Sequence, residues 1–168
     1  KKLVGEARDV IHDASPKLNR IAETELGKMP TYVAPHDIRF SQKTVNGSKE
    51  IIESMSKVGW KGDSVDVVRM PDGLLTTVDN TRVAAAQITN TPVSARIHEY
   101  TDNIDSTRIQ SLSREARYKV PANWAASEIP PHTPQTWGDG VENRIIRQGG
   151  KFARDNRYGS PELPRLNS

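Results

Sequence analysis

The chain has 168 residues and no cysteine, which excludes a disulfide framework, a thiolate zinc site and a cysteine nucleophile. Hydrophobic residues make up 35% of the sequence, so we expect one compact domain with a modest core, and no apolar run reaches the length of a membrane span. The net charge of +3 is compatible with a nucleic-acid partner but does not require one.

Two helices are predicted near the start of the chain. Apolar residues recur at helical spacing over residues 3–14, and Ser15-Pro16 is typical of the start of a second helix, which Gly27 ends. No signal-peptide pattern is present, and the sequence begins like the continuation of a longer chain. We therefore expect a helical linker segment over residues 1–30 and one domain over residues 31–168.

The next stretch predicts an extended connector, a short strand and a helix. Residues 29–35 are expected to be extended. In residues 36–42 the apolar Ile38 and Phe40 alternate with polar side chains, which is typical of a strand with one polar face. Residues 48–58 place apolar side chains on one face of a helix, and a glycine then ends it.

The central stretch predicts a β-hairpin followed by a helix. A valine-rich run at 65–68 favours a strand, Pro71-Asp72-Gly73 favours a tight turn, and residues 74–78 favour a returning strand. Asp79 is suited to cap the helix predicted over residues 80–88, whose alanines are small enough for close packing on a sheet.

The remaining residues predict one further strand and a basic extension. Residues 93–100 alternate as a strand, residues 107–119 suggest a short helix, and residues 120–136 form a proline-rich loop anchored by Trp124. A helix interrupted by glycines follows over residues 141–153. Ten basic and six acidic residues lie between 108 and 168, so positive charge concentrates there, either as a solvated surface or as a face that follows phosphates.

The order of these elements and several short motifs resemble the N-terminal domain of ParB proteins and the related sulfiredoxins. The resemblance covers residues 36–100 and implies an α+β fold, in which a small mixed sheet carries packed helices and residues 101–168 form an extension. Asp79 stands where the family has glycine, and Asn80 stands where sulfiredoxins have their catalytic cysteine, so sulfiredoxin chemistry is excluded. The matching motifs are Glu53-Ser54-Met55 to Gly59, Val65 to Val68, Asp79-Asn80-Thr81-Arg82-Val83-Ala84-Ala85 and Thr91-Pro92-Val93.

A second resemblance is to toxin modules at the C-terminus of large secreted bacterial proteins, those of contact-dependent growth inhibition and related polymorphic toxins. The motifs are "IRFSQ", "GWKGDxVDVVxMPDGxLTTVDNTRVAAA", "TWGxxVxxRI" and "GSxELP", within residues 32–166. Such modules are delivered into the cytoplasm of target bacteria and are mostly nucleases; several cleave tRNA, some with help from elongation factor Tu. The resemblance therefore implies a tRNA-cleaving ribonuclease. We also expect an inhibitory immunity protein that is acidic, since carboxylates best block a basic substrate face.

A metal-independent ribonuclease needs a base for the ribose 2′-hydroxyl, an acid for the leaving oxygen and cations for the phosphorane. In the ParB-like arrangement the first strand and the corner at residues 79–82 lie close, so we expect Arg39 and Arg82 to clamp one phosphate, with Asp79, His36 or His98 as the base. The helix N-terminus at the corner also suits a phosphate. The predicted substrate-binding side chains are Ser41, Gln42, Thr77, Asn80, Thr81, Arg144, Arg147 and Lys151.

Purely structural roles are the alternatives for the main candidates. Asp79 would then be only a helix cap, Arg82 only an ion-pair partner, His36 an exposed loop residue and His98 a hydrogen-bonded sheet residue.

No metal ligand and no cofactor are assigned from the sequence. Asp63, Asp66, Asp72 and Asp79 are close in sequence, but two of them are expected to serve turns. The alternative functions are a metal-dependent DNase on the same scaffold and a non-catalytic module of the ParB type that binds nucleic acid or a nucleotide.

Overall fold

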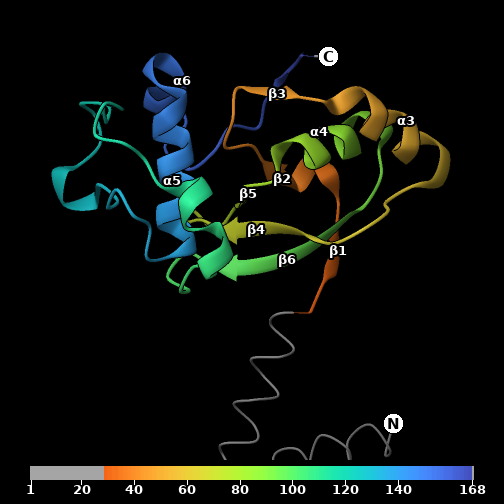
Figure 1. Ribbon diagram of the computed structural model, residues 1–168, viewed down its shortest axis with the longest axis horizontal. Helices are drawn as coiled ribbons and strands as arrows, with labels where there is room; N and C mark the ends of the chain where they lie inside the picture. Colours follow the sequence, from red (N-terminus) through yellow and green to blue (C-terminus); the bar gives the residue numbers. More distant parts are fainter. Residues whose placement is uncertain (1–28, 168) are drawn as a thin grey trace, which may run out of the picture.

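The structure is a computed structural model that describes residues 29–167 (Figure 1). This part of the chain is a mixed α+β fold with a five-stranded mixed sheet, a two-stranded sheet and four α-helices. The two helices predicted before residue 27 lie outside the described residues.

The five-stranded sheet is built around β4 (Val65–Arg69). β5 (Leu75–Thr77) returns antiparallel beside β4, and β6 (Val93–Glu99) lies parallel on its other side. β1 (Thr31–Val33) and β2 (Ile38–Arg39) form the two edges, in the order β1-β6-β4-β5-β2. The predicted hairpin and the strand after the central helix are confirmed.

One face of this sheet is covered by α3 (Ser48–Val58) and α4 (Asn80–Thr89), at the helix positions predicted. Val65 and Val67 of β4 point to this face and are fully buried with the alanines of α4. Because alanine side chains are short, α4 can approach the strands closely, and burial of its apolar side stabilises the layer.

The opposite face is only partly covered, by α5 (Trp137–Gln148) and α6 (Gly150–Asp155). Val68 of β4 and Met70, which follows the strand, belong to a second core with α5, so alternation along this stretch supplies two layers. Trp124 is buried there and its indole N–H donates to the Ala153 carbonyl at 3.2 Å, which confirms the predicted anchor of the loop. The basic extension is therefore part of the same packed domain.

Two predicted elements are shorter or different in the structure. The strand expected over residues 36–42 is limited to β2, because Pro35–Asp37 forms a 3-10 turn before it. The helix expected over residues 107–119 is wrong: the chain there forms two 3-10 turns, Ser106–Arg108 and Gln110–Leu112. A third 3-10 turn, Ala126–Glu128, lies in the proline-rich loop.

A second, two-stranded sheet joins distant parts of the chain. β3 (Thr44–Asn46) pairs in parallel with β7 (Arg165–Asn167), a pairing that the sequence did not predict. Nearby, Phe40 and Ser160 exchange backbone hydrogen bonds of 2.7 and 2.8 Å.

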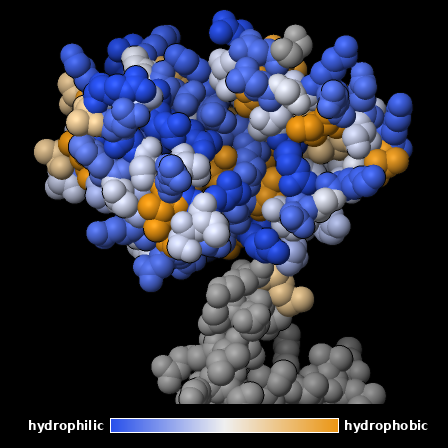
Figure 2. Space-filling view, in the orientation of Figure 1, coloured by the Kyte–Doolittle hydropathy of each residue, from blue (hydrophilic) through white to orange (hydrophobic). Residues whose placement is uncertain are grey.

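Polar side chains cover most of the face shown in Figure 2, with apolar atoms in small separate groups. Among the helices of the described residues, none has the length and apolar composition needed to cross a bilayer.

Candidate active site

A cleft of about 1090 Å³ lies on the face of the sheet that α5 leaves uncovered. Asp66 of β4 lies beside Arg96 of β6 in the parallel register, and His98 follows two residues later on the same face. Strand alternation and register thus bring one carboxylate, one guanidinium and one imidazole to a shared surface. The cleft is lined by Asp63, Ser64, Asp66, Asp79, Arg82, Arg96, Ile97, His98, Glu99, Asp102, Asn103, Asp105, Thr107, Arg108 and Trp137.

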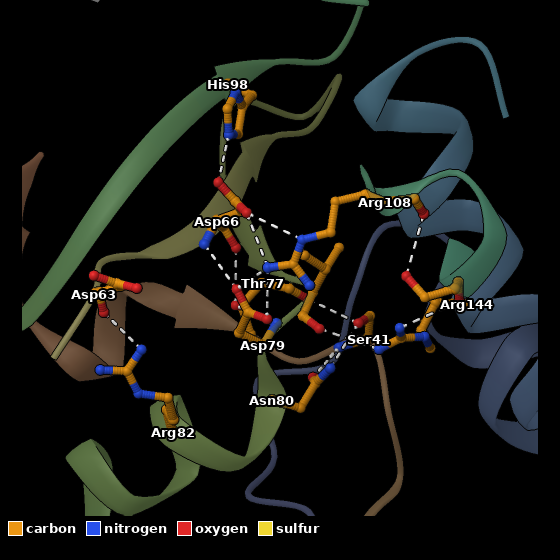
Figure 3. Close-up of polar contacts among 12 residues, drawn as sticks. Ser41, Asp63, Asp66, Thr77, Asp79, Asn80, Arg82, His98, Arg108 and Arg144 are labelled. Atoms are coloured by element: carbon orange, nitrogen blue, oxygen red, sulfur yellow. Dashed lines mark hydrogen bonds and ion pairs between the residues drawn. The ribbon is translucent and has the colours of Figure 1, made fainter. Parts of the chain in front are cut away.

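The most distinctive feature of the cleft is the pair formed by Asp66 and His98 (Figure 3). The Nε2 atom of His98 lies 2.8 Å from Oδ1 of Asp66, and each side chain is 16% exposed. A carboxylate on one ring nitrogen fixes the tautomer and orients the ring, which leaves Nδ1 as the nitrogen free to exchange a proton. Within the described residues Nδ1 makes no hydrogen bond. The pair therefore has the arrangement of a general base held by a carboxylate.

Arg108 bridges two of the aspartates that line the cleft, Asp66 and Asp79. It donates to Oδ2 of Asp66 at 2.9 Å and to both carboxylate oxygens of Asp79, at 2.8 and 2.9 Å. Burial alone would raise the pKa of Asp66, but hydrogen bonds from His98 and Arg108 and their charges outweigh it and lower that pKa. Asp66 is therefore held ionised, as an acceptor for His98.

Asp79 has the position of a helix cap but a different function from the one expected. It precedes α4, yet its side chain makes no capping hydrogen bond. Instead Oδ2 accepts the Asp66 N–H at 2.8 Å, and Thr77 links the two residues by accepting the Asp79 N–H and donating to the Asp66 carbonyl. The prediction that the Asp79 side chain caps α4 is therefore wrong, because the carboxylate points towards β4 and Arg108.

Arg82 lies at the edge of the cleft and is firmly held. Its guanidinium donates to the carbonyls of Asp63 and Lys61 at 2.6 and 2.9 Å and lies 4.2 Å from the centre of the Trp60 ring. Three of its five N–H donors remain for a ligand. The side chain of Arg96, by contrast, is exposed and makes no hydrogen bond or ion pair with any described residue.

The predicted clamp of Arg39 and Arg82 is not formed. Arg39 makes a double hydrogen bond to the Asp72 carboxylate at 2.6 and 2.9 Å and donates to Thr76. Asp72 follows the end of β4, whereas Asp63, the partner of Arg82, precedes its start. The two arginines therefore lie at opposite ends of this strand and cannot hold one phosphate together.

Several other predicted site residues lie outside the cleft. His36 is exposed in the 3-10 turn before β2, and Gln42 and Thr81 are half-buried without lining the cleft. Three residues predicted as substrate contacts have buried side chains that hold the corner together: Ser41 is 0% exposed, Thr77 0% and Asn80 2%. Ser41 and Asn80 bond to each other, so the end of β2 is tied to the start of α4.

The basic side chains of α5 and α6 are also engaged elsewhere. Arg144 donates to the Val78 carbonyl at 3.1 Å, and burial together with the neighbouring Arg147 lowers its pKa to about 10. Arg147 donates to the Ser111 carbonyl at 2.7 Å, and exposed Lys151 pairs with Asp155. None of the three predicted substrate contacts on these helices lines the cleft.

The cleft also contains four residues for which no catalytic or substrate-binding role was predicted from the sequence: Asp66, Arg96, Arg108 and Trp137. One signal was present: Asp66 is a carboxylate between buried valines of a strand, where a charge is rare unless it is paired. Among residues 29–167 no three His, Asp or Glu side chains gather in a way that would hold a metal ion.

Comparison with known proteins finds no match: no protein family model, no curated protein and no solved structure matches the chain.

Proposed function

We propose that the chain is a ribonuclease module that cleaves tRNA, acting as the toxin of a bacterial contact-dependent inhibition protein on a ParB-like scaffold. The observation that carries the proposal is the Asp66–His98 pair, which opens into a cleft that also contains Arg82, Arg96 and Arg108. The toxin context comes from the sequence resemblance.

In this proposal His98 starts the reaction. Nδ1 accepts the proton of a ribose 2′-hydroxyl, and the 2′ oxygen attacks the adjacent phosphorus. The bond from phosphorus to the 5′ oxygen breaks, which leaves a 2′,3′-cyclic phosphate, while water in the open cleft protonates the leaving oxygen. The hydroxide that remains takes the proton from His98, which restores the neutral imidazole. The negative charge that builds on the phosphorane is stabilised by the guanidinium groups of Arg96 and Arg82. Asp66 stabilises the imidazolium that forms.

The charged residues around the cleft favour binding of the substrate phosphate by individual arginines close to it, rather than by a broad basic surface. Six carboxylates and three guanidinium groups line the cleft, and two of the carboxylates share the single positive charge of Arg108. We propose that elongation factor Tu or another host factor helps to place tRNA against this mixed surface. An acidic immunity protein would then act chiefly on Arg82 and Arg96.

The test of the proposal is cleavage by the purified chain of total tRNA and of plasmid DNA, each with EDTA and with Mg²⁺. We expect tRNA fragments that end in 2′,3′-cyclic phosphate with or without EDTA, and none from the His98→Gln variant. Adding elongation factor Tu tests the host factor. Degradation of DNA that EDTA abolishes would replace the proposal by the DNase function, and tRNA binding without cleavage would replace it by the non-catalytic one.

A set of arginine variants tests which cations face the substrate. Arg96→Met and Arg82→Met should each lower tRNA cleavage by about 10²-fold, because each removes a donor to the charged phosphorane. Arg39→Met should cleave near the wild-type rate, since Arg39 is bound to Asp72 away from the cleft. Melting temperatures of all three separate loss of folding from loss of turnover. A slow Arg39→Met variant that melts like wild type would contradict this placement of the site.

A further inference from the structure

We infer that Trp137 is a positioning residue that holds the imidazole of His98 in its reactive orientation; the inference rests on the proposed function. The two rings are stacked, with centroids 3.9 Å apart and planes inclined by 11°. Trp137 is 3% exposed, so its face is covered by His98 on one side and by the second core around it.

The motif Thr136-Trp137-Gly138 fixes the indole at this place. Thr136 caps α5, with a reciprocal bond from the Thr136 N–H to Asp139, so Trp137 is held as the first residue of the helix. The Trp137 and Gly138 N–H groups donate to the carbonyls of Asp102 and Tyr100 at 2.9 and 3.0 Å. A Cβ at residue 138 would lie 2.3 Å from the Tyr100 ring, so only glycine allows this approach. The start of α5 is thereby fastened to the chain just after His98.

The stack supplies a restraint that the hydrogen bond to Asp66 lacks. One bond at Nε2 fixes a point on the ring, but the ring can still swing about the line from Nε2 to the carboxylate oxygen. A flat indole against its face removes this motion, and the direction of Nδ1 becomes defined. Catalytic groups must be aimed closely, and small misplacement lowers the rate strongly.

Kinetics of three variants test the role of the stack. Trp137→Leu should lower kcat for tRNA cleavage by about 10- to 100-fold with little change in KM, because the orientation of His98 affects the chemical step more than the binding of tRNA. Trp137→Phe keeps a flat ring and should recover most of kcat. Trp124→Leu is the matched control: this tryptophan is equally buried in the second core but lies away from the cleft, so it should lower the melting temperature and leave kcat near wild type.

Proton NMR of the His98 ring provides a readout that does not depend on activity. Because the His98 ring lies over an indole face, its ring protons should resonate upfield. Their signals are identified as those that disappear in the His98→Gln variant. In Trp137→Leu they should return to ordinary positions, with Trp137→Phe between the two. The inference is overturned if wild-type His98 shows no upfield shift, or if the shift is lost while kcat is unchanged. A shifted ring in a chain that cleaves no RNA would instead overturn the proposed function.

Discussion

Replacing His98 by glutamine should lower the rate of tRNA cleavage by about 10²–10⁴-fold, the usual contribution of a general base. Glutamine can still donate a hydrogen bond to Asp66, so the melting temperature should stay close to that of wild type. The measurement is single-turnover cleavage of tRNA together with thermal melting.

The matched control is His36→Gln, at the exposed histidine that precedes β2. It should cleave like wild type, because this residue lies outside the cleft. If His36→Gln were inactive and His98→Gln active, the active site would lie at the β2 edge of the sheet and not in the cleft.

Replacing Arg108 by methionine should destabilise the fold by about 2–4 kcal/mol at neutral pH. The side chains of Asp66 and Asp79 are 16% and 20% exposed, and both would lose their cation. Methionine keeps most of the length of the side chain, so the effect reports on charge and hydrogen bonds more than on packing. Urea unfolding at pH 7 measures it.

The pH dependence of the stability of Arg108→Met tests whether the loss of charge causes the destabilisation. The pKa of Asp66 is lowered in the folded protein, so its ion pair contributes stability above the unfolded pKa, and this contribution is lost as pH falls through the folded pKa. The difference in the free energy of unfolding between wild type and Arg108→Met should therefore become smaller below about pH 4. An equal difference at pH 7 and pH 3 would show that packing, and not charge, is responsible.

A surface arginine gives the control for Arg108. Arg117 pairs with Glu115, but their side chains are 66% and 73% exposed. Arg117→Met should therefore leave the free energy of unfolding close to that of wild type.

Local patterns in the sequence predicted most of the sheet and its helices. Each strand is marked by a local signal: a valine-rich run, a turn at residues 71–73 and an alternation over residues 93–100. The structure has strands at these places. The helix expected over 107–119 failed because two long-range contacts compete with it. Arg114 is buried and donates to Asn143 at 2.9 Å and to the Pro130 carbonyl at 2.8 Å, which bends the chain away from a helical path.

The site could be predicted only in part, for a related reason. His98 and Asp79 stand in recognisable local settings, but Arg108 reaches Asp66 and Asp79 from a short 3-10 turn whose position depends on tertiary packing. Trp137 comes from the start of α5, and only the fold places it against His98. A single sequence carries no periodic signal for such contacts, so the sequence indicated the cleft residues Asp79, Arg82 and His98 but not Arg108 and Trp137.

The pairing of β3 with β7 also has a kinetic consequence. Residues 44–46 meet residues 165–167, and Phe40 meets Ser160. These contacts each close a loop of roughly 120 residues, and chains with such high contact order fold slowly because the entropy of closure is lost before the contacts form. A chain that emerges gradually, from a ribosome or through a membrane channel, cannot complete this domain until residue 167 is free.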